Sequence, residues 1–532
     1  MILLALLLAA PAPTSRVTAA ELSAHIRFLS DDLTQGRKPG TPGSEIAIKY
    51  LAAELEEMGL RPAGDNGTYY QAVPLVELAA QVPGDIPFRA GDKSLVLHAG
   101  NGLEADMVFE ASAHIDHARV QDAPLVFAGY GIVAPEYGWD DYKDADVRGK
   151  VVVLLNFNPP FRGENVRLWY GRWDYKYLTA AAHGAAGAIL IHTTASAGYP
   201  WQVVVSSWST PHQDLPPAPD DKFLQFQSWI SEGAAARLAQ LSGQDLEKLR
   251  ASAQSKDFRP LALGSTMSLE MPIRMRTIQS ANVIGVLPGS DQRLRDEAVF
   301  FTAHHDHLGM VPPVPPATDG IYNGALDNAS GCAVILTIAR AATFAQPKRS
   351  LYFAFVTAEE QGLLGSKWLA QHPPLPAARI AADINVDSPN KWGKTTDLGV
   401  IGLGKSSIDD LVKRAAAEQG RAVHGDPFPD RGAFYRSDQF PFARVGVPVL
   451  YAKGGPTFAG RPPGWGEAQL RAYEMHDYHQ PSDEYRGDWD LSGMVQDAQL
   501  ELTVGLRIAD APSMPRWTPG DEFEAARKSA AR

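Results

Sequence analysis

Cysteine is nearly absent from this chain of 532 residues, whose single cysteine is Cys332. An intramolecular disulfide needs two cysteines, and a zinc cluster built on thiolates needs several, so the sequence excludes both. A chain of this length buries enough apolar surface to fold without such cross-links. The cysteine count therefore leaves the cellular compartment open.

Basic residues are in the minority. Lys and Arg number 49 against 61 Asp and Glu, which gives a formal net charge of −12 with His neutral. Nucleic-acid binding depends on a basic face that contacts phosphates, so the charge argues against a nucleic-acid partner. With 45% hydrophobic and 21% charged residues, the composition is that of a globular protein and excludes a largely disordered or collagen-like chain.

Long apolar runs are also lacking. The run Ile2–Ala10 is far shorter than the roughly 20 residues of a membrane-spanning helix, and no other stretch is long and apolar enough. Followed by Pro11-Ala12-Pro13, it fits the apolar part of a secretory signal. We therefore expect residues 1–19 to be a signal peptide and the protein to be exported to the periplasm or the medium. No Lys or Arg precedes the run, so a short buried N-terminal helix is the alternative.

The apolar pattern divides the rest of the chain into three regions. In residues 20–105 it predicts a helix over 44–58, because Ala47, Leu51 and Leu55 fall on one face. Residues 106–272 hold short β-rich runs between glycine turns, which predicts a separate small domain.

Residues 273–512 alternate strands with helices, which predicts an α/β fold with a mostly parallel central sheet flanked by helices. Residues 513–532, with two prolines and a basic end, are expected to form a loose tail. The predicted strands are 282–287, 299–303, 351–356, 381–385 and 448–452, and the predicted helices are 329–343, 363–371, 406–419 and 492–508.

Acidic residues and histidines gather where the predicted strands end, and in one late loop. Open α/β sheets bind ligands at the carboxyl ends of their strands. The clusters are Ala303–His307, Gly324–Gly331, Thr357–Gly362, Asn385–Pro389 and Met475–Asp483. Alone, each has a simpler explanation: Asp327 fits a helix cap, Glu359-Glu360 a solvated helix start, and His479 a surface residue. In combination they supply two histidines and three carboxylates, a donor set for two zinc ions, with one further acid as general base.

These motifs make the chain similar to the co-catalytic di-zinc exopeptidases of metallopeptidase family 28. The stretch Leu29–Gly43 resembles the N-terminal signature of that family. Phe127–Ile132 and Asp141–Lys150 resemble parts of an inserted protease-associated (PA) domain over residues 106–272. The resemblance implies that residues 20–105 and 273–512 together form the catalytic zinc peptidase domain.

The resemblance also implies a ligand set for two zinc ions. His304 and Asp387 would bind one ion, and Glu360 and His479 the other. Asp327 would bridge the two ions with one oxygen to each.

Three further residues take catalytic roles by the same resemblance. Glu359 would be the general base, which removes a proton from a water that zinc has made more acidic. Tyr478 would donate a hydrogen bond to the developing oxyanion. Asp306 would accept a hydrogen bond from the second ring nitrogen of His304 and so fix its tautomer.

Other candidates are not expected to bind metal. His305 and His307 share a cluster with His304, and His476 lies three residues before His479, but none of them matches a ligand position. Cys332 is expected to be a small buried helix residue. Residues 436–441 resemble a segment that lines the site in the family.

The sequence thus predicts an exported zinc aminopeptidase that acts on peptide substrates, with no nucleic-acid partner and no membrane span beyond the signal. The alternatives on the same scaffold are a carboxypeptidase and an N-acyl amino-acid amidohydrolase. Family carboxypeptidases carry an additional C-terminal helical domain, for which about 50 residues after His479 leave no room. A receptor-like binding protein without a metal site is disfavoured by the intact ligands. The sequence sets neither the preferred N-terminal residue nor the oligomeric state.

Overall fold

The structure is a computed structural model that describes residues 12–102, 104–112, 114–161, 166–208, 211–313 and 318–530. The first part of the predicted signal, residues 1–11, lies outside the described residues. Val17 is buried in the core and Thr18 caps helix α1 (Ala19–Leu29). The predicted boundary at residue 19 therefore falls at the first turn of a packed helix. Within the described ranges, no helix is both long and apolar enough to cross a bilayer.

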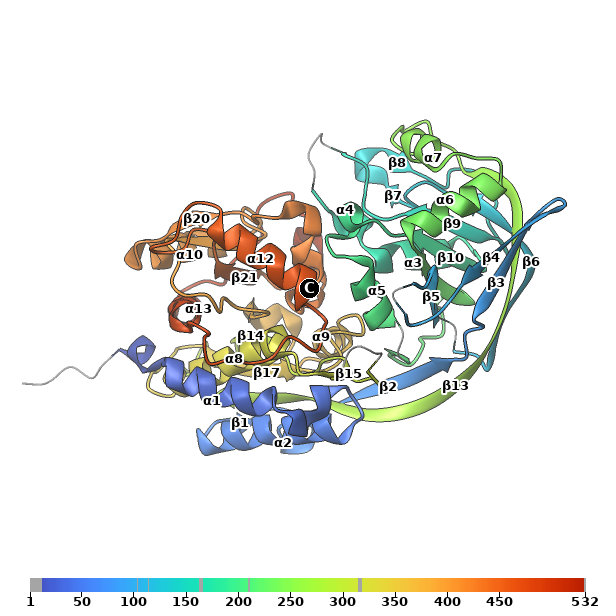
Figure 1. The fold of residues 1–532 in the computed structure, drawn as a ribbon. Helices are drawn as coiled ribbons and strands as arrows, with labels where there is room; N and C mark the ends of the chain where they lie inside the picture. Colours follow the sequence, from blue (N-terminus) through green and yellow to red (C-terminus); the bar gives the residue numbers. More distant parts are fainter. Residues whose placement is uncertain are drawn as a thin grey trace, which may run out of the picture.

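Residues 12–84 and 273–530, which we call the catalytic half because they include the predicted peptidase domain, are built on a mixed sheet, seen in Figure 1 below and left of the second sheet. Four neighbouring strands at its centre are parallel, with the order β17–β14–β18–β21. Antiparallel strands flank them on both sides. The sheet is thus mixed with a parallel centre, and the five predicted strands are confirmed. The strands are β14 (Ala298–His304), β17 (Ser350–Val356), β18 (Ile380–Asn385) and β21 (Val449–Gly454), flanked by β13 (Leu261–Leu287), β2 (Tyr70–Ala80) and β19 (Asp397–Ile401).

Helices cover both faces of this sheet, which is why its central strands are apolar throughout rather than alternating. Every residue of β14 is buried. Phe301 packs into the cluster on one face, whereas the adjacent Phe300 packs into the cluster on the other. The first face carries α1, α2 (Pro42–Glu57), α8 (Ser330–Ala342), α10 (Ile408–Glu418) and α13 (Ser492–Asp510), and the second carries α9 (Leu364–Gln371) and α11 (Gln439–Arg444).

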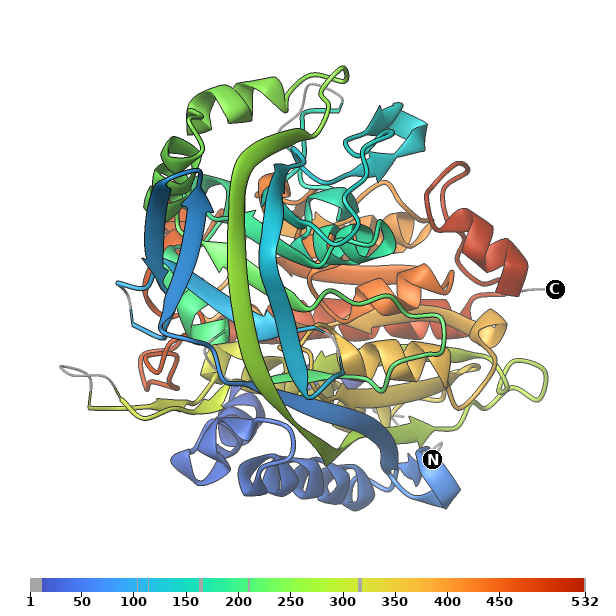
Figure 2. The same ribbon diagram turned by 90° about the vertical axis from the view of Figure 1, so that its right-hand side faces the viewer.

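A second sheet forms a β-rich lobe, which we define as residues 85–272. Its strands include β5 (Met107–Ala111), β6 (His117–Phe127), β9 (Val151–Leu155), β10 (Gly187–Ile191) and β12 (Phe226–Ile230). The lobe is joined to the first sheet by β13, whose first half pairs with β6 and whose second half pairs with β2. Figure 2 shows this single long strand running from one sheet into the other beside β6.

The observed strands correct the predicted domain limits. The hairpin of β3 (Asp85–Ala90) and β4 (Lys93–His98) pairs with Thr266 and Met267 of β13, so the lobe begins well before residue 106. The predicted limit at 272 falls inside β13, because no turn interrupts that strand. The identity of the lobe as a PA domain stays a prediction.

The prediction of a loose tail over 513–532 is wrong for the residues that the structure describes. Trp517 and Phe523 are buried in the cluster on the second face of the sheet. The indole N–H of Trp517 donates to the carbonyl oxygen of Gly446 at 2.9 Å. Helix α14 (Glu524–Ala530) follows. The burial of Trp517 and Phe523 fixes this segment against the sheet, although its prolines and basic end suggested a loose tail. Residues 531–532 lie outside the described part of the chain.

Candidate metal centre

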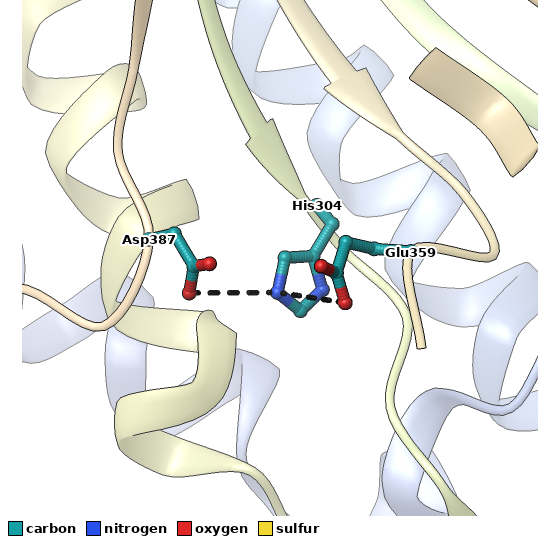
Figure 3. A group of neighbouring side chains, drawn as sticks. All are labelled: His304, Glu359 and Asp387. Carbon is teal, nitrogen blue, oxygen red and sulfur yellow. Dashed lines mark ion pairs between the residues drawn. The ribbon is translucent and has the colours of Figure 1, made fainter. Parts of the chain in front are cut away.

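All five predicted ligands meet at the carboxyl edge of the parallel strands. His304 ends β14, Glu360 follows β17 after a short turn, and Asp387 follows β18. Asp327 lies in the irregular turn that precedes α8, and His479 in the loop after α12 (Trp465–His476). Figure 3 shows the imidazole of His304 between the carboxylates of Asp387 and Glu359.

Asp327 lies between the two histidines. Its Oδ1 is 3.2 Å from Nε2 of His304, and its Oδ2 is 3.4 Å from Nε2 of His479. Each histidine also faces a carboxylate of its own: Asp387 Oδ1 is 3.7 Å from the first Nε2, and Glu360 Oε2 is 3.0 Å from the second. This is the arrangement expected of a carboxylate that bridges two cations.

The chemistry of these groups fits divalent cations. Nε2 of His304 is buried and, in the described part of the chain, has no hydrogen-bond partner of good geometry. Burial by itself lowers the pKa of His304, yet Glu359 and the other carboxylates raise it well above its ordinary value. The pKa of His479 is likewise raised to about 10 by Glu360 and Asp327, against the effect of burial. Both imidazoles thus lie where positive charge is strongly favoured, and imidazole with carboxylate is a common zinc donor set.

Asp306 lies beside His304 as predicted, but a different oxygen faces the ring. Nδ1 of His304 is 3.2 Å from the main-chain oxygen of Asp306 and 3.7 Å from its carboxylate. The carboxylate instead accepts hydrogen bonds from the main-chain N–H of Glu359, at 3.0 Å, and of Glu360, at 3.4 Å. Asp306 therefore orients the imidazole through its carbonyl and holds the turn with the two glutamates through its side chain. Residue spacing alone does not distinguish these oxygens.

The adjacent glutamates Glu359 and Glu360 differ in their proton affinity. Burial raises the pKa of Glu359 well above its usual range, and Glu360 and Asp438 add to the effect while His304 opposes it. Burial also acts to raise the pKa of Glu360, but His479 and His307 overcome it and lower that pKa to about 2. Neighbouring carboxyls with pKa values driven apart are typical of a site where one group transfers protons and the other stays anionic.

Tyr478 lies at the centre with its hydroxyl held by Arg436. Nη2 of Arg436 donates to the Tyr478 hydroxyl oxygen at 3.0 Å, and the phenol ring stacks on His479 with centroids 4.0 Å apart. Burial raises the pKa of Tyr478 well above its ordinary value, although Arg436 acts to lower it. The phenol is therefore a hydrogen-bond donor at neutral pH. Sequence reasoning placed residue 436 at the site but assigned it no role.

Two supporting residues had no role in the sequence prediction although their motifs were noted. The carboxylate of Asp483 accepts from the main-chain N–H of Leu326 and Asp327 at 3.1 and 3.0 Å, which fixes the bridging loop. Nδ1 of His307 lies 2.6 Å from Oε1 of Glu360.

Arg37 supports the centre from the N-terminal region. Its buried guanidinium donates to the main-chain oxygens of His305, Asn323 and Gly324 at 2.9, 2.6 and 3.0 Å. These carbonyls belong to the loops that carry His304 and Asp327. Nothing in the sequence links residue 37 to positions so far along the chain.

Of the residues that were expected not to bind metal, His307 contacts the carboxylate of Glu360, whereas the others face main-chain oxygens or solvent. Nε2 of His305 is 3.0 Å from the main-chain oxygen of Ala281, and His476 is exposed. Cys332 is buried in α8, and its Sγ lies 3.1 Å from the main-chain oxygen of His304.

Two cavities meet at Glu359 and Tyr478. The smaller, of about 770 Å³, lies between the lobe and the catalytic half. The larger, of about 1220 Å³, extends into the catalytic half, and Lys453 and Asp426 are among its charged groups. Its apolar walls include Trp392, Ile401, Phe428, Leu470 and Tyr473.

Comparisons with known proteins relate part of the chain to a family of peptidases. Residues 282–503 match peptidase family M28. The chain is similar to a probable zinc metalloprotease of Pyrenophora tritici-repentis (strain Pt-1C-BFP), with 32% identity over 124 residues, 23% of this chain and 26% of that protein. It is also similar to aminopeptidase YwaD of Bacillus subtilis (strain 168), with 32% identity over 143 residues, 26% of this chain and 29% of that protein. The match thus spans little more than a quarter of these curated relatives.

The fold is similar to that of a solved structure over nearly its whole length. The aminopeptidase from Aneurinibacillus sp. strain AM-1 superimposes with a TM-score of 0.53 over 94% of this chain and 96% of that one, at 19% sequence identity.

Proposed function

Because residues 282–503 carry a domain of peptidase family M28, we propose that this chain is a zinc-dependent aminopeptidase that releases N-terminal residues from peptides. The observation that carries the proposal is the position of Asp327, whose two oxygens each face one histidine. We propose two zinc ions, one at His304 with Asp387 and one at His479 with Glu360, with Asp327 shared between them. The names of the similar proteins support zinc and an aminopeptidase.

When bound, zinc supplies Lewis acidity, which makes water more acidic and polarises the scissile carbonyl. The protein moves the protons. Glu359, whose pKa is raised by burial, takes a proton from the attacking water and later delivers it to the leaving amine. Tyr478 and Arg436 are the hydrogen-bond donors available to the carbonyl oxygen as it becomes negative.

The larger cavity supports a preference for apolar side chains. It opens at Glu359 and Asp387, and aromatic and aliphatic side chains line much of its wall beside several charged groups. Burial of an apolar side chain there gains about 1.5–3 kcal/mol. The ammonium of Lys453 disfavours a cationic side chain. We propose that this cavity receives the side chain of the residue to be released.

A carboxypeptidase is the second candidate, because Arg436 and Lys453 line the same cavity and could hold a terminal carboxylate. An N-acyl amino-acid amidohydrolase would use the same centre. A binding protein without catalysis is disfavoured, since the proposed ligands and the proposed base lie within one site.

A panel of aminoacyl and N-acetyl-aminoacyl p-nitroanilides tests the proposal, with and without chelator and added zinc. Chelator-sensitive cleavage of free-amine substrates alone is expected. Cleavage of the acetylated substrates would favour the amidohydrolase. If neither series reacts while the protein holds two zinc ions, peptides with free and amidated carboxyl ends would test the carboxypeptidase.

Export is proposed from the sequence alone, on the apolar run Ile2–Ala10. N-terminal sequencing of the mature protein from the periplasm or the medium tests it. Recovery of the protein from the cell interior with Met1 retained would refute it.

A further inference from the structure

The β-rich lobe touches the metal centre through helix α5 (Trp201–Trp208). The hydroxyl oxygen of Ser207 lies 3.0 Å from Nδ1 of His479. The neighbouring Ser206 hydroxyl instead donates to main-chain oxygens, to that of Val203 at 3.1 Å and that of His479 at 3.3 Å. Thus two adjacent serines contact the same loop, but only Ser207 contacts the imidazole.

The position of the imidazole makes this contact chemically significant. Nε2 of His479 points at Glu360 and Asp327, at 3.0 and 3.4 Å, where a cation would lie. A neutral imidazole binds a cation through Nε2 only when its proton is on Nδ1, and the acceptor at Nδ1 selects that tautomer. The acceptor here is the hydroxyl of Ser207.

We propose that Ser207 is a positioning residue: it accepts the Nδ1 hydrogen of His479 and thereby makes one of the two metal sites depend on the lobe. The proposal rests on the proposed two-zinc centre. It assigns the lobe a part in assembling the site, in addition to forming one wall of the cleft.

The lobe holds α5 firmly enough for this role. Val204, Val205 and Trp208 of the helix are buried in the core of the lobe. The lobe in turn is fixed to the catalytic half by main-chain contacts. The N–H of Arg167 donates to the oxygen of Pro429 at 2.9 Å, and that of Gln213 to Oε1 of Gln361 at 3.0 Å. The hydroxyl of Ser207 is therefore carried on a rigid element.

The groups that face Nδ1 of His304 and Nδ1 of His479 come from different parts of the chain. Nδ1 of His304 faces the main-chain oxygen of Asp306, two residues along the same loop. Nδ1 of His479 faces a side chain on helix α5 of the lobe, more than 270 residues away. Loss of the Ser207 hydroxyl should therefore weaken the His479 site and leave the His304 site unchanged.

The test measures zinc binding to the full-length, metal-stripped protein by competition with a chromophoric chelator. For Ser207→Ala we expect one of the two binding steps to weaken about 10–100-fold, as is typical when the partner of a metal-binding histidine is removed. The other step should be unchanged. The matched control is Ser206→Ala, which removes a hydroxyl from the same helix and should bind both ions like the wild type.

A second pair of variants keeps the test decisive if Ser207→Ala does not fold. Ser207→Thr and Ser207→Val have the same shape, but only threonine retains the hydroxyl. Threonine should preserve both affinities, and valine should weaken one. Wild-type binding of both ions by Ser207→Ala or Ser207→Val would overturn the inference, as would equal weakening by Ser206→Ala.

Peptide hydrolysis is measured in parallel. A wild-type protein that binds two zinc ions but cleaves nothing would refute the proposed function and leave the role of Ser207 standing. A wild-type protein that binds fewer than two ions would refute both.

Discussion

Replacement of Glu359 by glutamine tests whether Glu359 is the general base while the adjacent Glu360 is a metal ligand. Glutamine has the size of glutamate and keeps the turn, whose N–H groups bond to Asp306. It cannot accept a proton from water. We expect Glu359→Gln to bind zinc like the wild type and to lose most of its turnover.

The structure sets the size of the effect. Oε2 of Glu359 lies 3.9 Å from Nε2 of His304, farther than Asp327 at 3.2 Å and Asp387 at 3.7 Å, and we expect the proposed ligand set to remain. What is lost is general acid–base catalysis, worth about 10²–10⁴ in rate. At about 1.36 kcal/mol per factor of ten, the barrier should rise by about 3–5 kcal/mol.

The assay combines kcat on a free-amine p-nitroanilide with zinc content by elemental analysis. Glu360→Gln is the matched control, because it makes the same change one residue along and should lose a zinc ion. Loss of zinc from Glu359→Gln would show that Glu359 is a ligand, since its oxygen also lies within reach of a cation held by His304 and Asp387. A rate within tenfold of wild type would refute its role as the base.

Three further changes test other parts of the molecule. Arg37→Met should destabilise the protein by at least about 3 kcal/mol in denaturant unfolding, because each of several buried carbonyls would lose its donor at about 1–3 kcal/mol; an unchanged midpoint would contradict the role assigned to Arg37. Trp517→Ala should cost about 3–5 kcal/mol by the same measurement, as expected for a large buried aromatic, whereas a loose tail would show no change. Lys453→Met should raise kcat/KM for lysyl relative to leucyl p-nitroanilide by about tenfold, because it removes a like charge from a partly desolvated cavity; an unchanged ratio would place the released side chain elsewhere.

The elements that bring the ligands together could be predicted from the sequence. The strand that ends at His304 and the strands before Glu360 and Asp387 are largely apolar runs, and parallel strands present their carboxyl ends at one edge. The similarity to a known family then assigned each ligand. Topology brings together the three ligands at strand ends, whereas Asp327 and His479 reach the site from the turn before α8 and from the loop after α12.

Contacts between distant segments could not be predicted. Arg37 bonds to carbonyls that lie 268 to 287 residues away, and Ser207 reaches His479 from helix α5 of the lobe. Neither contact is marked in the sequence by a periodic pattern or by a local motif. The tail was mispredicted for a related reason. Trp517 and Phe523 hold it only because they pack into the apolar cluster on the second face of the sheet, and the sequence does not show that contact.

The shared strand β13 has a consequence for how the two halves can move. At the point where one half passes into the other, the chain is hydrogen-bonded to β6 and then to β2, with Gln81 N–H donating to Pro272 O at 2.8 Å. A junction made of paired strands can bend, but it does not allow the two halves to rotate freely as a flexible linker would. Limited proteolysis should therefore spare residues 265–285, and removal of 106–272 would cut a strand in two rather than excise a module.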